Sequence, residues 1–317
     1  MNESWRHVVQ AQEAGLRLDK VVATVTGWAR AKVRRAVAAG AVQVNDRRCL
    51  VAAHLVAPDE ELRIFPVNPD RDHIDDGKLR LLFEDEALLV VDKPAGLPTQ
   101  PPPRGGDALS LRVATHLAEA KDAERRRDGQ PHVGLIHRLD RDASGLLLFG
   151  KRKEATAALS RGLRRHNMRR YYLALVRTAV TVPTQQIEEP LAPNEQGGTR
   201  CHASGVPART TVVQLAFDPV ARLALVGLRL HSGRMHQARV HLAWGVGVIV
   251  GDGRYGDPLA DGSRLALHCA ALQLRHPRSG EIMRWQSPPP PDFLAASGSA
   301  ALPLPEDWLR QIEEAAQ

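Results

Sequence analysis

Apolar residues recur at helical spacing in the first part of the chain. Within residues 16–25 they lie on one face of a helix, which predicts an amphipathic segment. A second helix is expected over 29–40, with Gly40 as its C-terminal stop. The next stretch, AVQVNDRRCLV (41–51), alternates apolar and polar residues around an Asn-Asp pair and predicts a hairpin. Together these patterns predict a small α/β unit over residues 16–65.

The rest of the chain mixes short apolar strands with helices. Residues 65–78 are rich in Pro and Asp without periodicity, which indicates a linker. The β-α-β alternation of a doubly wound sheet is missing, so we predict an α+β fold with a mixed, mainly antiparallel central sheet flanked by helices. The expected elements are two strands within 79–96, helices at 109–127 and 154–168, and strands at 169–176, 210–230 and 264–286. We therefore predict an N-terminal domain (1–68), a linker (69–78) and a larger domain (79–317).

Composition narrows the class of protein. With 317 residues, 43% apolar and 25% charged, the chain is typical of a globular protein of one to three domains. Its formal net charge of +7 suits a polyanionic partner such as nucleic acid. The three cysteines form no C-x-x-C pair, which argues against a disulfide framework or a structural zinc site. No apolar run suits a membrane span or a signal peptide, so we expect a cytoplasmic protein without membrane association.

Basic residues gather in the small N-terminal unit. Between Ala29 and Arg48, six Lys or Arg residues stand against a single acid, Asp46. A charge run of this kind is commonly the solvated face of a helix. An RNA-binding surface is the alternative, because the residues span the second helix and the adjoining hairpin. The six candidates for RNA binding are Arg30, Lys32, Arg34, Arg35, Arg47 and Arg48.

The stretch GLIHRLDRDASGLLLFGK (134–151) ends in G-x-x-x-x-G-K, which is close to a nucleotide-binding P-loop. A P-loop needs a solvated glycine-rich loop and a Ser or Thr after its lysine. Here four bulky apolar residues fill the loop positions and Arg152 follows the lysine, so we predict a buried strand instead.

Three histidines at intervals of five would point in different directions on a helix, so we expect no metal site at His231, His236 and His241.

The same stretch contains HRLDRDASG, which places two carboxylates and two arginines in a short turn. An Asp before Ser-Gly is commonly a turn former that caps backbone N–H groups. A catalytic role needs a partner, and HSGRMHQARVHLAWG (231–245) offers one. If this stretch is helical, Arg239 lies three residues after His236 on a shared face.

A third stretch, RGLRRHNMRRYYLALV (161–176), runs five arginines in ten residues into two tyrosines. Basic residues beside aromatic rings suit RNA, because the charges meet phosphates and the rings stack on bases. The alternative is an exposed helix end followed by core tyrosines.

HRLDRDASGLLLFGK resembles the catalytic motif of the RluA-type pseudouridine synthases. Four further stretches are similar to motifs of that family and stand in its order: EDEALLVVDKPAGL, RRYYLALV, SGRMHQARVHLAWGVGVIVGDGRYG and LALHCAALQLRHPRSGEIMRWQSPPP. LRLDKVVA and ARAKVRRAVAAGAVQVNDR are similar to an S4 RNA-binding domain, which some branches of the family carry in front. The resemblance covers nearly the whole chain.

The chain departs from the family pattern at several positions. Ala143 stands where Thr is usual before Ser-Gly, and Arg170 replaces the lysine of a Lys-x-Tyr strand. Met235 stands where the arginine motif usually has Thr. None of these changes removes a carboxylate, the tyrosine or Arg239, so we expect them to affect substrate contacts and not the chemistry.

The resemblance implies an enzyme that isomerises uridine to pseudouridine within RNA, without a metal or other cofactor. It implies Asp140 as the reacting carboxylate, Arg239 as its ion-pair partner and Tyr172 as the residue that stacks on the target base. Arg138 would fill the space left by the nucleotide that is flipped out of the RNA. Further RNA contacts are expected from Arg169, Arg170, Arg234 and His236.

The S4 resemblance favours large-subunit ribosomal RNA over tRNA as the substrate, and we expect a monomer. Two other classes of protein remain as alternatives. One is a non-catalytic S4-type RNA-binding protein, against which the complete set of Asp140, Tyr172 and Arg239 argues. The other is a phosphohydrolase with Asp140 as its nucleophile, which would need more acids for magnesium than Asp142 alone.

Overall fold

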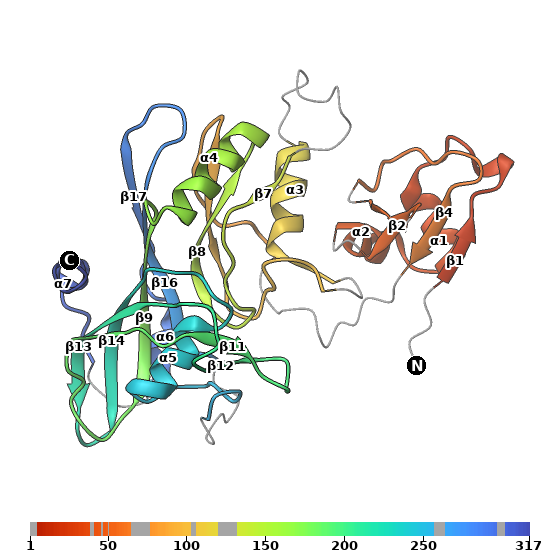
Figure 1. The fold of residues 1–317 in the computed structure, drawn as a ribbon. Helices are drawn as coiled ribbons and strands as arrows, with labels where there is room; N and C mark the ends of the chain where they lie inside the picture. Colours follow the sequence, from red (N-terminus) through yellow and green to blue (C-terminus); the bar gives the residue numbers. More distant parts are fainter. Residues whose placement is uncertain are drawn as a thin grey trace. The chain divides into compact units, whose positions relative to one another are not determined.

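The computed structural model of the chain forms two compact units (Figure 1). The first comprises Met1–Arg80 and Leu97–Val133, and the second comprises Leu81–Gly96 and Gly134–Gln317. The structure describes residues 5–38, 41–45, 47–49, 51–64, 77–102, 106–119, 132–256, 264–296 and 302–317. The predicted helix stop, one turn residue of the hairpin and most of the linker lie outside these ranges (Gly40, Asp46 and 65–76). The domain boundaries stay a prediction.

The first unit contains a small four-stranded antiparallel sheet with helices. Its elements are β1 (Trp5–Val8), α1 (Leu18–Thr26), α2 (Arg30–Ala38), β2 (Val42–Val44), β3 (Arg47–Arg48), β4 (Glu61–Ile64) and α3 (Leu109–Glu119). The strand order is β1-β4-β2-β3, and β2 with β3 forms the predicted hairpin. Helix α1 ends at Gly27, whose φ of 70° is a left-handed conformation that favours glycine. Leu18, Val22 and Val33 from the two helices pack in one core with Leu62 of β4, which confirms the predicted amphipathic helices.

Eleven strands of the second unit form one sheet. They are β5 (Leu81–Glu84), β6 (Leu88–Lys93), β7 (Gly134–Leu135), β8 (Ser144–Gly150), β9 (Arg169–Arg177), β10 (Gln185–Ile187), β13 (Thr210–Asp218), β14 (Leu223–Leu230), β15 (Val248–Ile249), β16 (Leu267–Arg275) and β17 (Ile282–Gln286). The main path runs β10-β13-β14-β9-β16-β8-β6-β5. Its neighbours are antiparallel except for β8 and β16, which are parallel. This confirms the predicted α+β fold with a mixed, mainly antiparallel sheet.

Helices and a short hairpin complete the second unit. They are α4 (Lys153–Arg164), α5 (Gln237–Gly245), α6 (Pro291–Ala295) and α7 (Trp308–Ala315), with β11 (Leu191–Pro193) paired to β12 (Thr199–Cys201). Helix α4 packs on β7 and β8, and α7 packs on β13 and β14. Helix α4 ends four residues earlier than the predicted 168, and His166 just after it has a left-handed φ of 58°. No helix in the described parts of the chain is long and apolar enough to span a membrane.

Strand β8 lies inside the sheet between β6 and β16, and all of its residues are buried. This is the apolar run that the sequence analysis distinguished from a P-loop, and the prediction of a buried strand is confirmed. Lys151 follows the strand and donates hydrogen bonds to the Glu84 carboxylate at 2.5 Å and to the Asp85 carbonyl at 2.6 Å. The lysine therefore forms an ion pair with Glu84 at the end of the sheet and does not bind a nucleotide phosphate as a P-loop lysine would.

The Ser-Gly pair at the start of β8 lets this strand approach β16 closely. Gly145 has a φ of 109°, which strongly favours glycine, and a Cβ there would lie 2.3 Å from the Cys269 carbonyl oxygen. Any side chain would therefore push the two strands apart. The loop that carries Asp140 ends at this junction, so the glycine helps to fix where that loop enters the sheet.

Helix α5 begins at Gln237, and its N-cap residue His236 has a left-handed φ of 54°. The buried Gln237 side chain donates to the Arg209 carbonyl and the Thr210 hydroxyl, each at 3.0 Å. It also accepts hydrogen bonds from the Ser232 hydroxyl and the Arg234 backbone N–H. These four contacts tie the glycine-containing loop before the helix to β13.

Candidate active site

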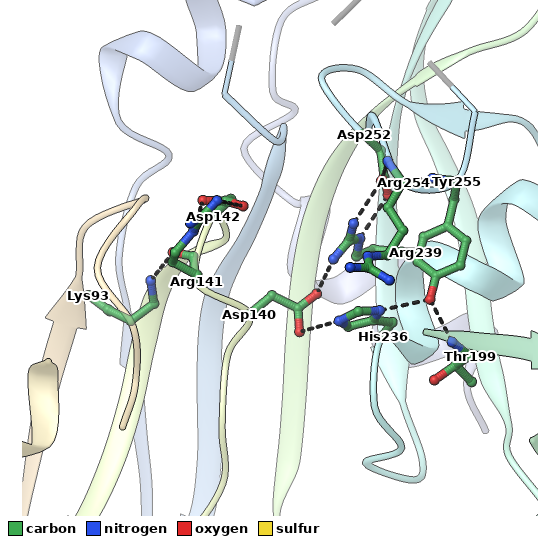
Figure 2. Close-up of polar contacts among 10 residues, drawn as sticks. All are labelled: Lys93, Asp140, Arg141, Asp142, Thr199, His236, Arg239, Asp252, Arg254 and Tyr255. Carbon is green, nitrogen blue, oxygen red and sulfur yellow. Dashed lines mark hydrogen bonds and ion pairs between the residues drawn. The ribbon is translucent and has the colours of Figure 1, made fainter. Parts of the chain in front are cut away.

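The loop before β8 and the first turn of α5 meet in an ion pair between Asp140 and Arg239 (Figure 2). Arg239 Nη1 donates to Asp140 Oδ2 at 2.9 Å, although the two residues are 99 positions apart in the sequence. The Asp140 side chain is 24% exposed and the Arg239 side chain 11%. The carboxylate is thus reachable from outside, while the guanidinium that neutralises it is mostly buried.

Asp140 does not act as a turn-capping residue in this structure. Among the described residues, the only hydrogen bond to its carboxylate comes from Arg239, and its backbone carbonyl accepts the Ala143 N–H at 3.3 Å. The second carboxylate oxygen, Oδ1, lies 3.9 Å from His236 Nε2, which is too long for a direct hydrogen bond. One oxygen is therefore held and the other is left to interact with a substrate.

Arg239 is itself fixed by a second carboxylate, Asp252. Its Nε and Nη2 donate to the two Asp252 oxygens at 2.8 and 2.7 Å, a bidentate geometry that sets the plane of the guanidinium. Asp252 is 1% exposed and also accepts the backbone N–H groups of Arg254 and Tyr255. Burial alone would lower the pKa of Arg239, but the hydrogen bonds and charges of Asp252 and then Asp140 outweigh it and raise the pKa.

A second chain of hydrogen bonds reaches Asp140 through His236. The Tyr255 hydroxyl accepts the Thr199 backbone N–H at 2.9 Å, so its own proton is available for His236 Nδ1 at 2.7 Å. In neutral His236 the remaining proton then lies on Nε2, the nitrogen that faces Asp140. Burial lowers the pKa of His236 by more than the charge of Asp140 restores, which favours this neutral form.

Lys93 anchors the turn that follows Asp140. Its Nζ donates to the Arg141 and Pro94 carbonyls, each at 2.8 Å, and the residue is fully buried at the end of β6. Burial lowers the pKa of Lys93 to about 7, and the nearby Asp142 acts in the opposite direction. The lysine thus holds the loop that carries Asp140 to the end of β6 through main-chain contacts.

The second carboxylate of the motif lies in a different environment from the first. Asp142 accepts two hydrogen bonds from the side chain of its neighbour Arg141, at 2.8 and 3.1 Å. Both side chains are about half exposed or more, at 48% and 67%. Asp142 makes no contact with Arg239 or His236, so the structure separates the two acids of the motif.

Tyr172 lies in the interior, in β9 opposite Cys269 of β16. It is 3% exposed, and burial raises its pKa well above the ordinary value of a tyrosine. The phenol therefore keeps its proton, and Asp140 is near enough to contribute to the raised pKa of Tyr172. Its predicted contact with a target base stays a prediction.

Of the five RNA-binding candidates of the second unit, His236 is partly buried beside Asp140, and the structure separates the other four into two groups. Arg138, Arg169 and Arg234 are exposed, as a contact with RNA requires. Arg170 is only 4% exposed and donates to the Ser232 carbonyl at 2.7 Å. Its guanidinium holds the loop before α5 from inside the protein, and its contact with RNA, like that of the equally buried Tyr172, stays a prediction.

On α2, the described basic side chains of Arg30, Lys32 and Arg34 are all exposed. The Lys32 ammonium lies 4.4 Å from the centre of the Trp28 ring, a cation–π contact. The structure does not describe the side chains of Arg35, Arg47 and Arg48. An RNA-binding surface over the whole set stays a prediction.

Sequence reasoning missed three residues of this site: Lys93, Asp252 and Tyr255. A lysine that ends the apolar run LLVVDK was the available signal for Lys93. The polar residues of GDGRYG stand just after a short strand, but nothing in their spacing indicates that they reach back to α5. Among the described residues, no group of three or more His, Cys, Asp or Glu side chains is arranged to hold a metal ion.

This geometry provides a partly exposed carboxylate with one free oxygen, a buried and rigid guanidinium, and a neutral imidazole. Such a carboxylate can attack an electrophilic carbon or accept a proton, and the fixed arginine balances its charge beside an anionic substrate.

The chain matches known proteins over most of its length. The RNA pseudouridylate synthase family model matches residues 87–244, which include Asp140, Tyr172 and Arg239, and the S4 domain model matches residues 16–62. Ribosomal large subunit pseudouridine synthase C of Escherichia coli is 33% identical over 88% of this chain and 91% of that protein. Ribosomal large subunit pseudouridine synthase D of Nitrosomonas europaea is 32% identical over 89% of this chain and 83% of that protein.

Solved structures share the fold. Human RNA pseudouridylate synthase domain containing 1 superposes with a TM-score of 0.60 at 23% identity, over 76% of this chain and 96% of that one. Human RNA pseudouridylate synthase domain containing 4 gives a TM-score of 0.54 over 68% of this chain and 91% of that one. The chain therefore belongs to the RluA-type pseudouridine synthases, isomerases that convert uridine to pseudouridine in RNA, and carries their S4 domain at residues 16–62.

Proposed function

We propose that the protein converts uridine to pseudouridine in large-subunit ribosomal RNA, with Asp140 as the reacting carboxylate. The observation that carries the assignment of Asp140 is its ion pair with Arg239, which leaves one carboxylate oxygen free at a partly exposed position. The substrate class is supported by two relatives named for the large ribosomal subunit, both at least 32% identical over most of this chain.

The reaction breaks the bond between C1′ and N1 of the uridine, turns the uracil, and forms a bond between C1′ and C5. N1 gains a proton and C5 loses one, so there is no net hydrolysis or redox change. Attack of Asp140 on C1′, its addition to C6, and its assistance in eliminating the uracil each bring Oδ1 against the nucleoside. In all three routes Arg239 keeps Oδ2 in place and compensates the charge near the RNA phosphates.

The target nucleotide must leave its stack, because C1′ and C5 are not accessible to a carboxylate inside a helix. We assign the exposed Arg138, two residues before Asp140, to the space that the flipped nucleotide leaves. Tyr172 is assigned to the target base, as a ring to stack on and as a neutral phenol.

We also propose that the protein is a cytoplasmic monomer. The cytoplasmic location is supported by relatives named for the large ribosomal subunit, because ribosomes are made in that compartment.

Release of tritium from RNA transcribed with [5-³H]uridine tests this function, since the reaction replaces the C5–H bond. Purified protein should release tritium from large-subunit ribosomal RNA, up to a small whole number of sites per molecule. Bulk tRNA, treated in parallel at the same uridine concentration, should release little. Release from tRNA alone would overturn the proposed substrate while leaving the family activity in place.

The reaction should need no metal or nucleotide from solution. An isomerisation without hydrolysis requires no metal-activated water and no phosphoryl donor, so EDTA should leave the rate on folded RNA within about twofold. The assay compares EDTA with added magnesium on an RNA whose fold is checked by its melting curve in both buffers. A rate lost in EDTA and recovered with magnesium, on RNA that stays folded, would contradict this expectation.

The basic face of α2 should contribute to RNA affinity and not to the chemical step. Arg30 and Arg34 are exposed one helical turn apart, and replacing both by Gln removes two cations while keeping helix propensity. We expect weaker RNA binding and a slope of log K against log salt concentration that is smaller in magnitude by about one to two. The rate at saturating RNA should change little. Arg6→Gln with Lys20→Gln is the matched control, and equal affinities for both double variants would mean that the α2 face is only solvated.

A further inference from the structure

His236 lies beside the carboxylate of Asp140, next to the oxygen that Arg239 does not hold (Figure 2). Its Nε2 atom is 3.9 Å from Oδ1, and its side chain is 16% exposed. Among the described residues, the imidazole makes one side-chain hydrogen bond, at Nδ1, with the Tyr255 hydroxyl at 2.7 Å. Nε2 therefore has no hydrogen-bond partner in the described parts of the chain and faces the oxygen that meets the nucleoside.

Tyr255 fixes the direction in which the imidazole points. Its hydroxyl accepts the Thr199 backbone N–H at 2.9 Å and donates to Nδ1 of His236. The two rings meet edge to face, with centres 5.6 Å apart and an angle of 81° between their planes. The Tyr255 ring is held in turn by the Arg239 guanidinium, whose carbon lies 5.0 Å from the ring centre. The imidazole cannot turn Nε2 away from the site without losing these contacts.

The imidazole is a neutral hydrogen-bond donor. Burial lowers the pKa of His236, and the charges of Arg239 and Arg254 act in the same direction, against those of the two nearby carboxylates. Because Nδ1 accepts from Tyr255, the single ring proton lies on Nε2. The site therefore presents one uncharged N–H group beside the free oxygen of Asp140.

Two structural explanations leave this N–H group unused. His236 is the N-cap residue of α5, but its side chain forms no capping hydrogen bond with the helix. Its φ of 54° is left-handed, a conformation that Asn or Gly would adopt more readily. An ion pair with Asp140 would need the charged imidazolium, which burial disfavours, and 3.9 Å is too long for a hydrogen bond. A contact with the substrate explains the histidine better.

The reaction develops negative charge close to this donor. When the C1′–N1 bond breaks, its electron pair stays on the uracil and is shared between N1 and the carbonyl oxygens O2 and O4. O2 is bonded to the carbon next to N1, so it is the carbonyl oxygen nearest to C1′. A fixed N–H group that meets O2 stabilises the anion until C5 bonds to C1′. The imidazole keeps its proton, so the balance of the isomerisation is unchanged.

We propose that His236 donates a hydrogen bond from Nε2 to O2 of the target uracil as the C1′–N1 bond breaks, and that Tyr255 is the positioning residue that directs it. The inference rests on the proposed function, with Asp140 against the nucleoside. It gives the predicted RNA contact of His236 a specific partner, which is the target base and not a phosphate. The bond to N1 breaks in each route open to Asp140, so the role is the same in all of them.

A matched pair of substitutions tests the donor. Gln and Met have nearly the same length and shape, but only Gln keeps an N–H group near the position of Nε2. Single-turnover rates and RNA affinities are measured on a synthetic RNA with one target uridine. We expect His236→Met to lower the rate about a hundredfold, as for loss of one donor to an oxyanion, and His236→Gln to lower it less than about tenfold. RNA affinity should stay within about twofold, because the contact strengthens only as charge develops.

Replacing O2 of the target by sulfur shows whether the donor meets that atom. Sulfur is a weak hydrogen-bond acceptor, so the rate on 2-thiouridine should fall by no more than about fivefold in His236→Met, in a double-mutant cycle between protein and substrate. 4-Thiouridine at the same position is the matched control and should show the same loss as uridine. Chromatography of the digested nucleosides measures isomerisation of all three substrates. A substitution that only disturbed the loop would slow all three equally.

Tyr255→Phe tests the positioning role, and it repeats the test if His236→Met unfolds. Loss of the hydroxyl should lower the rate on uridine by about tenfold, because the imidazole loses its fixed direction. The ratio of the uridine rate to the 2-thiouridine rate should move toward that of His236→Met. The double variant should be no slower than His236→Met alone, because Tyr255 acts through His236.

Three results would overturn the inference. They are equal losses on uridine and 2-thiouridine in His236→Met, equal rates of His236→Met and His236→Gln, and a Tyr255→Phe protein that keeps the wild-type ratio of the two substrates. None of them affects the proposed function, which the wild-type rate on uridine measures separately.

Discussion

Replacing Asp140 by Asn is expected to abolish pseudouridine formation while leaving the fold and RNA binding intact. Asn keeps the size of the side chain and an oxygen that can accept from Arg239 Nη1, but it removes the negative charge and the reactive carboxylate oxygen. We expect the rate to fall by about three orders of magnitude or more, as for loss of a reacting group in other enzymes. Tritium release under single-turnover conditions measures it, with RNA binding and thermal melting measured on the same preparation.

Asp142→Asn is the matched control, two residues away in the same turn. Its partner Arg141 is largely exposed, so loss of the pair should cost no more than about 1 kcal/mol of stability and leave most of the activity. Turnover above about one per cent of the wild-type rate in a verified Asp140→Asn preparation would refute the catalytic assignment. Unfolding of that variant would instead indicate that Asp140 has an architectural role.

Asp252→Asn should reduce the rate by about a hundredfold without a comparable change in RNA affinity. Asn can retain one of the two hydrogen bonds to Arg239 but presents an amide to the other nitrogen, so the guanidinium loses its fixed plane. Misplacing a catalytic partner by about 1 Å can cost about a hundredfold in rate. Leaving a buried guanidinium donor without its acceptor should also reduce stability by about 1–3 kcal/mol.

Asp307→Asn provides the comparison for Asp252, since Asp307 pairs with Arg310 at 2.8 Å on the exposed side of α7. That variant should keep the wild-type rate and melt at nearly the same temperature. The informative quantity is the split between the rate at saturating RNA and the apparent RNA affinity. A folded Asp252→Asn protein with a rate within a few-fold of the wild type would show that Asp252 does not position Arg239.

The sequence was sufficient for the elements that depend on local pattern. The run Leu146–Phe149 predicted a buried strand, and the helices near Leu18 and Val33 followed from their apolar faces. Helix ends were less accurate, as at α4, because a left-handed residue such as His166 is decided by local hydrogen bonding and not by periodicity. The sheet order could not be predicted, since pairs such as β8 with β16 join strands more than a hundred residues apart.

The candidate site depended more on family resemblance than on pattern. The residue pattern offered 231–245 as a candidate partner for the Asp140 turn, but the specific pairing with Arg239 came from the resemblance, because 99 residues separate the two and no spacing rule connects them. The resemblance did not indicate the bidentate role of Asp252, nor the orientation of His236 by Tyr255. It also suggested that Arg170 faces RNA, whereas the fold turns that guanidinium inward to Ser232. The direction in which a side chain points from the sheet depends on tertiary packing, which the order of residues does not reveal.

Site-resolved mapping of pseudouridine in total RNA tests the central claim most directly. The comparison uses a strain without this gene and the same strain complemented with the wild-type protein or with Asp140→Asn. The account predicts that one or a few pseudouridines in large-subunit ribosomal RNA disappear in the deletion strain. They should return with the wild-type protein and stay absent with Asp140→Asn. An unchanged set of pseudouridines in the deletion strain, or their return with Asp140→Asn, would contradict it.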